Sequence, residues 1–222
     1  MIILGIDSSD EFVSVGVAGP AGVFISRSSE VEARNKNILH GFMADTLSEK
    51  GLSFADLDGV AIAIGPGSFT GLRVGLATAK GLCWSMDIPL TGVSCISAVA
   101  GCSKPGGQRL LAIKDAKKKE FYYGGFAMTK TGMAQTIPDS LGSAEDIFML
   151  IRKGYKVAGP GVFALKKNLP PQFTVDDEFD RGCLGGEIAR QGRASLISGE
   201  KLNIAEAAPN YIRTPRFVRE RA

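Results

Sequence analysis

The chain contains a single histidine, His40, among its 222 residues. Metal motifs that need two histidines are therefore impossible, which excludes the usual ligand sets of zinc proteases and of non-haem iron enzymes. A Ser-His-Asp triad would have to use His40, which lies in a helical pattern with no catalytic partner visible beside it. We interpret His40 as a polar residue on a helix surface, and we expect no metal site.

The chain also has few cysteines, a low net charge and no long apolar run. The four cysteines form no C-x-x-C pair, so we expect free thiols in a reducing cytoplasm. The formal net charge of +3 does not by itself indicate a nucleic-acid-binding protein. No apolar run approaches the roughly 20 residues of a membrane helix, and the first residues do not resemble a signal peptide. We therefore expect a cytoplasmic protein that does not enter a membrane.

A glycine-rich turn between a strand and a helix is the most informative motif that is present. The apolar run at residues 60–64 stops at Gly65, and Gly67 and Ser68 follow just before a helical pattern. Such an arrangement is a common anion-binding site. The spacing departs from the dinucleotide fingerprint, the Walker loop and the nucleophile elbow. Two interpretations stay open: a phosphate-binding turn, or a tight turn that lets the helix pack close to a strand.

A polar turn at residues 7–11 follows the first apolar strand.

The order of the segments predicts an α/β protein with two subdomains. A meander of three strands is followed by helices that alternate with two more strands, and a glycine-rich loop near residues 104–107 divides the chain. We predict domains at residues 1–103 and 104–222, with the last helix or tail packing back on the first domain. The predicted strands are 2–6, 12–18, 23–28, 60–64, 90–93, 110–113, 120–126 and 155–158, and the predicted helices are 37–50, 72–86, 95–101, 144–152 and 184–197.

The two long helices of the first domain carry broad apolar surfaces. Apolar residues cover a wide arc of the first helix, and the second helix combines an apolar stripe with small residues that permit close approach. Both stripes could face their own sheet. Their residues are Ile38, Leu39, Phe42, Met43, Leu47, Leu72, Gly75, Leu76, Ala79 and Cys83.

Several motifs resemble those of one protein family. Residues 3–9 (ILGIDSS) resemble the first phosphate motif of the sugar kinase, heat-shock chaperone and actin superfamily. This resemblance implies that Asp7 could orient a magnesium-bound water. With the glycine turn, it makes the candidate nucleotide-binding residues Asp7, Ser8, Ser9, Gly65, Gly67 and Ser68. The more specific segment 65–75 (GPGSFTGLRVG) resembles the signature of the TsaB (YeaZ) family, and residues 115–122 (DAKKKEFY) and 209–213 (PNYIR) resemble two further family segments. One departure is Lys119, where the family commonly has glycine. The resemblance is close over residues 1–125 and thin from there to residue 209.

The resemblance implies an actin-like fold of two α/β subdomains with mixed sheets flanked by helices. It also implies a non-catalytic role, because TsaB pairs with TsaD, which transfers a threonylcarbamoyl group to the adenosine beside the anticodon of ANN-decoding tRNAs. The ATPase TsaE joins them. In TsaB-like proteins, the helix pair that matches residues 37–50 and 72–86 packs against the equivalent pair of TsaD. The residues named above for these two helices are therefore the candidate partner interface, and the wide apolar arc of the first helix favours it. TsaD carries a metal-binding H-x-x-x-H motif that this chain lacks. The resemblance further implies no cofactor of its own, ATP or ADP at the interface of the complex, and a homodimer when the partner is absent.

Other functions stay open at this point. An actin-like ATPase or phosphotransferase acting alone would use Asp7 and the glycine turn, but no clear second phosphate loop follows residue 103. A glycoprotease-type peptidase is at odds with the single histidine. Direct contact with tRNA could come from the arginine-rich C-terminus or from Lys117, Lys118 and Lys119. Charged, solvated chain ends are nevertheless common without any such role.

Overall fold

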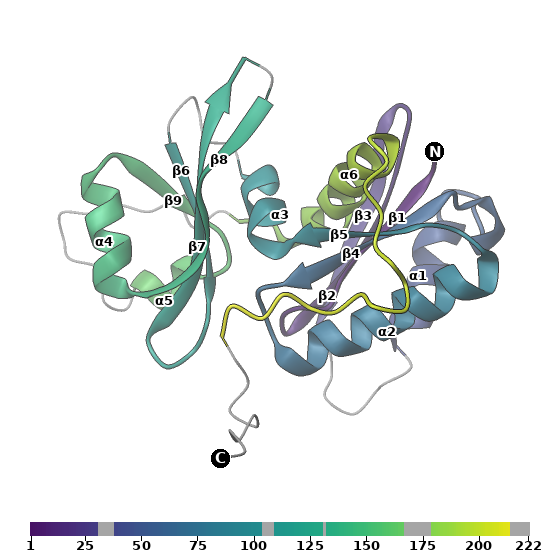
Figure 1. Cartoon of the computed structure of the whole chain (residues 1–222), viewed down its shortest axis with the longest axis horizontal. Coiled ribbons are helices and arrows are strands. Elements are labelled where there is room, and N and C mark those ends of the chain that lie inside the picture. The colour runs from purple at the N-terminus through teal and green to yellow at the C-terminus, as the bar shows by residue number, and fades with distance from the viewer. Residues whose placement is uncertain (31–37, 104–108, 131, 167–178, 214–222) are drawn as a thin grey trace. The chain divides into compact units, whose positions relative to one another are not determined.

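The chain folds into two units that each contain one mixed sheet flanked by helices (Figure 1). The computed structural model describes residues 1–30, 38–103, 109–130, 132–166 and 179–213. Unit 1 comprises Met1–Ala98 and Asp180–Pro209, and unit 2 comprises Val99–Phe179 and Asn210–Ala222. The predicted α/β architecture of two mixed sheets with flanking helices is confirmed. The loop predicted at residues 104–107 lies outside the described residues.

Unit 1 is built on a five-stranded sheet in the order β3-β2-β1-β4-β5. Its first three strands form an antiparallel meander, whereas β4 and β5 run parallel to β1 because helices connect them. The strands are β1 (Ile3–Asp7), β2 (Phe12–Gly19), β3 (Gly22–Glu30), β4 (Gly59–Gly65) and β5 (Leu90–Ser94). The helices are α1 (Ile38–Ser48), α2 (Phe69–Met86), the first turn of α3 (Cys95–Cys102) and α6 (Leu184–Ile197), with short 3₁₀ turns η1 (Phe54–Asp56) and η2 (Arg181–Cys183).

The two faces of this sheet are covered by different helices. Leu4 and Ile6 of β1 lie in the apolar cluster beneath α1 and α2. The residue between them, Gly5, faces the opposite side, since successive side chains of a strand alternate. A Cβ at Gly5 would lie 2.2 Å from the carbonyl oxygen of Gly185 in α6. The sheet is therefore sandwiched between α1 and α2 on one face and α6 on the other.

A row of small residues crosses all five strands beneath α6. The strand register aligns Ser26, Gly16, Gly5, Ala61 and Thr91 in adjacent positions from β3 to β5. Because this row has almost no side-chain volume, the backbone of α6 lies directly on the sheet.

The N-terminal N–H groups of α6 are satisfied by the same sheet. Gly185 N donates to Ser14 Oγ over 2.9 Å, and Gly186 N donates to Ser26 Oγ over 2.8 Å. Unsatisfied N–H groups at a buried helix start are unfavourable, so these serines stabilise the docked helix.

Unit 2 repeats the strand arrangement of unit 1. Its sheet has the order β8-β7-β6-β9, with an antiparallel meander and a parallel strand, as in β3-β2-β1-β4. The two α/β subdomains with mixed sheets that the resemblance implies are thus visible in the topology. The strands are β6 (Arg109–Asp115), β7 (Glu120–Thr129), β8 (Gly132–Ser143) and β9 (Tyr155–Ala158), and the helices are the last turn of α3, α4 (Ala144–Arg152) and α5 (Val162–Lys166).

The four cysteines are not all free thiols. Cys83 and Cys95 are buried free thiols, but Cys102 and Cys183 are disulfide-bonded, so the expectation of four free thiols was wrong. Residue 37, where the first predicted helix begins, lies outside the described residues. Within the described ranges, no helix is both long enough and apolar enough to cross a membrane.

Candidate functional site

The glycine turn after β4 is hydrogen-bonded to the turn that follows β1. Ser68 N donates to the carbonyl oxygen of Ser9 over 2.8 Å, and Ser8 Oγ donates to the carbonyl oxygen of Gly71 over 2.9 Å. Ser68 also caps α2, because its Oγ accepts a hydrogen bond from Gly71 N. The two predicted phosphate motifs are therefore brought together, but they bind each other.

Glycine is needed in this turn because the chain segments lie so close. A Cβ at Gly67 would lie 2.5 Å from Ser9 O, and one at Gly71 would lie 1.9 Å from Ser8 O. At Gly75, one turn further along α2, a Cβ would lie 2.1 Å from Ser8 Oγ. Gly65 adopts a φ of 121°, which side chains other than glycine rarely allow. The tight-turn interpretation of the sequence accounts for all four glycines.

Three of the candidate nucleotide-binding residues, those at the end of β1 and just after it, are buried in this arrangement. Asp7, Ser8 and Ser9 are 2%, 7% and 2% exposed. Two N–H groups of the facing turns are already engaged, since Ser9 N donates to Asp7 Oδ1 over 2.8 Å and Ser68 N donates to Ser9 O. Phosphate cradles depend on backbone N–H groups that point outward at the ligand, and these two point at acceptors within the chain.

No metal centre is found in the part of the chain that the structure describes. There, no group of three or more His, Cys, Asp or Glu side chains is placed to hold an ion. His40 is exposed on α1, and its ring stacks on Phe54 with the centroids 5.1 Å apart. This contact agrees with the interpretation of His40 as a surface residue.

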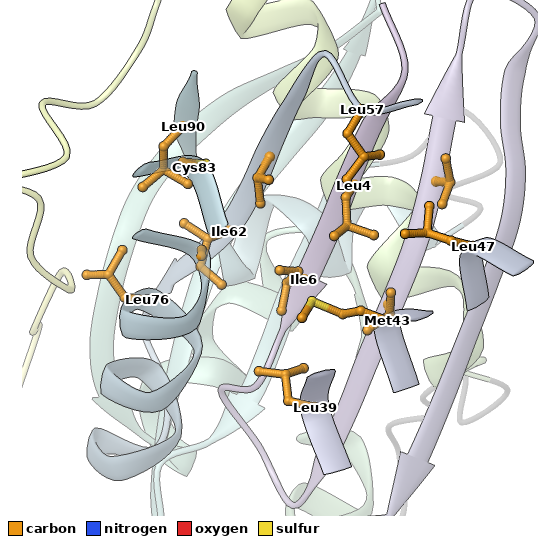
Figure 2. Packing of buried hydrophobic residues seen from close by; sticks show 14 of the residues in the cluster. Leu4, Ile6, Leu39, Met43, Leu47, Leu57, Ile62, Leu76, Cys83 and Leu90 are labelled. Carbon is orange, nitrogen blue, oxygen red and sulfur yellow. The ribbon is translucent and has the colours of Figure 1, made fainter. Parts of the chain in front are cut away.

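The apolar stripes predicted to face a partner face the sheet instead. Figure 2 shows side chains from α1 and α2 meeting those of the sheet in one cluster. Phe42 is partly buried against the same cluster, with the Arg27 guanidinium 5.3 Å from the centre of its ring, and the side chain of Ile38 lies outside the described residues. Most side chains of the predicted interface fill the core of unit 1. The buried ones are Leu39, Met43, Leu47, Leu72, Gly75, Leu76, Ala79 and Cys83.

The opposite side of α2 presents an exposed apolar surface, which we call the α2 outer face. It consists of Val74, Ala77, Gly81 and Trp84. Val74 is 49% exposed and Trp84 is 78% exposed, although tryptophan is usually well buried. A Cβ at Gly81 would have no neighbour within 4 Å. Two large apolar groups thus flank two small residues, so another helix could approach closely between them.

The sequence also predicts this surface, although the apolar stripe that faces the core does not include its residues. The four residues of the α2 outer face are spaced by three, four and three positions, which places them on one side of a helix. A second apolar stripe, opposite the first and containing the chain's single tryptophan, indicates a helix with two partners.

Cys83 provides a check that the predicted interface stripe is buried. Desolvation raises the pKa of its thiol from 9.0 to about 12, despite a hydrogen bond with the backbone of Val60 that lowers it. A shift of this size reduces the reactive thiolate at pH 8 by about 1,000-fold. We expect iodoacetamide at pH 8 to leave Cys83 unmodified in the folded chain and to label it in guanidinium, as read by peptide mass spectrometry. Rapid labelling of the folded chain would contradict the burial of this face of α2.

Comparison with known proteins connects this architecture to one family. A family model described as TsaD, tRNA N6-adenosine threonylcarbamoyltransferase, matches residues 29–205. The chain is 27% identical over 219 residues to "tRNA threonylcarbamoyladenosine biosynthesis protein TsaB" of Bacillus subtilis (strain 168), covering 96% of this chain and 94% of that protein. It is 33% identical over 135 residues to the protein of the same name from Escherichia coli (strain K12), covering 60% of this chain and 58% of that protein.

A solved structure shows the same fold over nearly the whole chain. The structure named "YeaZ from Pseudomonas aeruginosa" has a TM-score of 0.76 and 21% sequence identity, and the match covers 95% of this chain and 99% of that one. At this identity the likeness shows the fold and carries nothing about ligands or partners.

Proposed function

Because the chain belongs to the tRNA N6-adenosine threonylcarbamoyltransferase (TsaD) family, on its TsaB (YeaZ) branch, we propose that it is a non-catalytic subunit in tRNA threonylcarbamoyladenosine biosynthesis. Its role in this proposal is to bind and activate TsaD, the subunit that transfers the threonylcarbamoyl group to the adenosine beside the anticodon. TsaE, an ATPase, joins the complex, and tRNA is bound by the assembly.

The observation that carries this proposal is the α2 outer face. A helix that is already buried on one side by its own sheet exposes a tryptophan and a valine around two small residues. Aromatic residues in the centre of an apolar patch are characteristic of protein interfaces. We assign this surface to TsaD, and we replace the buried residues of the predicted interface with Val74, Ala77, Gly81 and Trp84.

A non-catalytic role is supported by the chemistry of the glycine turn. The turn would have to supply phosphate donors if the chain acted alone as an ATPase, but the N–H groups of Ser68 and of the facing Ser9 are bonded within the chain. We propose that the chain binds no nucleotide of its own and that ATP or ADP is held in the complex. Without TsaD, the same outer face is proposed to pair with a second copy, since two-fold dimers are the commonest association of identical chains.

Reconstitution of the tRNA modification tests the proposal. TsaD, TsaE and an unmodified ANN-decoding tRNA transcript are combined with the threonylcarbamoyl donor, with and without this chain. We expect modified adenosine, measured by nucleoside mass spectrometry, only when the chain is present. Equal modification without the chain would overturn the proposal. Turnover of Mg-ATP by the isolated chain would overturn its non-catalytic part.

A further inference from the structure

A groove of about 560 Å³ opens in unit 1 where α2 and α6 end and β5 begins. Asp87, the C-cap of α2, lies on one side of it, and the last turn of α6 lies on another. Its volume is in the range of about 300–1,000 Å³ that is usual for binding pockets. Most of its wall is apolar and is formed by Ile88, Pro89, Leu90, Leu196, Leu202 and Ile204.

The segment at residues 199–207 forms one wall of the groove and is attached to α2. Leu202 N donates to the carbonyl oxygen of Leu90 over 2.8 Å, at the start of β5. Lys80 Nζ, on α2, donates to the carbonyl oxygen of Ala205 over 3.3 Å. The segment is drawn in yellow beside α2 in Figure 1. The wall of the groove is therefore bonded to the helix that carries the α2 outer face.

Trp84 lies between the α2 outer face and the groove. It is four positions after Lys80 and three before Asp87, and residues at these spacings are neighbours on a helix surface. Its side chain is 78% exposed. Ile197, in the last turn of α6, is 58% exposed. The apolar surface of α2 thus continues past Trp84 to the groove, and exposed apolar surface of this extent is typical of interaction sites.

The charges around the groove favour a basic group in its occupant. The C-terminal ends of α2 and α6 both adjoin it, and the C-terminus of a helix carries roughly half a negative charge. Asp87 adds a full negative charge, against the positive side chain of Lys201. The ammonium group of Met1, which also lines the groove, lies 3.7 Å from the carboxylate of Asp58.

We propose that this groove receives a segment of TsaD that carries an apolar side chain next to a basic group. The apolar wall removes the side chain from water, and Asp87 attracts the basic group at the edge. TsaD is the occupant because the groove is continuous, through Trp84, with the surface assigned to that protein. This inference rests on the proposed function for the identity of the partner.

Hydrogen–deuterium exchange, read by peptide mass spectrometry on the full chain, tests the occupancy without any substitution. We expect residues 196–204 and α2 to exchange at least about fivefold more slowly when TsaD is bound. Peptides from α4 and α5 of unit 2 are the internal control and should not change. Protection of α2 without protection of residues 196–204 would overturn the inference and leave the proposed function standing. If TsaD protects neither region, both fail.

A bulky side chain at the edge of the groove provides a second test. Lys201 is exposed, so Lys201→Trp should leave the urea midpoint of unfolding nearly unchanged. We expect this variant to weaken TsaD binding at least about 10-fold, because the new side chain competes for the groove. Lys153→Trp makes the same change at an exposed position of unit 2 and should alter affinity less than about twofold. Binding of TsaD by Lys201→Trp as tight as that of the parent would overturn the inference.

The charge of the occupant is tested at Asp87. Asp87→Asn suits the left-handed conformation at this position, where φ is 53°. We expect it to weaken TsaD binding about threefold at low salt and to have little effect at about 1 M salt. Equal affinity of parent and variant at low salt would overturn the basic group in the occupant. Protection of residues 196–204 that rises with chain concentration in the absence of TsaD would assign the groove to a second copy instead.

Discussion

Replacing Gly16 with alanine is expected to lower the free energy of unfolding by at least about 3 kcal/mol, from one added methyl group. The new Cβ would lie 2.2 Å from Gly186 N and 2.5 Å from the carbonyl carbon of Gly185. These are backbone atoms of α6, so no side chain can turn aside to make room. The helix must move off the sheet, which would break the hydrogen bonds from its first N–H groups to Ser14 and Ser26.

The size of this effect is large compared with the total stability of a domain, which is about 5–15 kcal/mol. Gly5→Ala is expected to behave in the same way, because its Cβ would lie 2.2 Å from Gly185 O. Urea unfolding followed by far-ultraviolet circular dichroism measures both variants. Surface substitutions usually change the free energy of unfolding by no more than about 0.5 kcal/mol. A change as small as this in both variants would contradict the prediction.

Gly41→Ala is the matched control for the added methyl group. Gly41 lies inside α1, is exposed, and a Cβ there would have no neighbour within 4 Å. Alanine favours a helix over glycine by about 0.8–1.0 kcal/mol. This variant is therefore expected to be slightly more stable than the parent chain, which would show that the loss at Gly16 comes from the close approach of α6.

Most elements of the fold follow from sequence patterns that act over short distances. The predicted helix at residues 144–152 coincides with α4, whose start is fixed by a capping box between Ser143 and Asp146. The predicted strand at residues 155–158 coincides with β9. The strand β8 was not predicted, because its residues are largely polar and include Pro138, a combination more typical of loops than of strands. It is an edge strand, where such residues are tolerated.

The candidate site could be predicted less well, because periodicity shows that a stripe is apolar and does not show what covers it. The stripe that includes Leu76 and Cys83 was assigned to a partner, but the sheet of unit 1 buries it. The glycine turn was correctly located between a strand and a helix. Its purpose depends on Ser8 and Ser9, which are about 60 positions away in the sequence and reach the turn only in the folded chain.

The exposure of Trp84 makes the assignment of the partner surface testable with little risk to the fold. The side chain contributes little to the core, so its removal should leave the unfolding midpoint nearly unchanged. Substitutions in the buried stripe would instead lower stability and confuse loss of binding with loss of folding. Trp84 is also the single tryptophan of the chain, so its fluorescence reports on this surface alone.

Trp84→Ala is expected to weaken binding to TsaD about 30-fold, which corresponds to the roughly 2 kcal/mol of an interface hot spot. Ala77→Arg should weaken it further, because it places a charge where two helices approach closely. Calorimetric titration measures both, and burial of Trp84 in the parent complex should shift its emission to shorter wavelength. Phe163→Ala is the control, since this side chain is 73% exposed on α5 of unit 2. Binding by both α2 variants as tight as that of the parent would show that TsaD is bound by another surface of the chain.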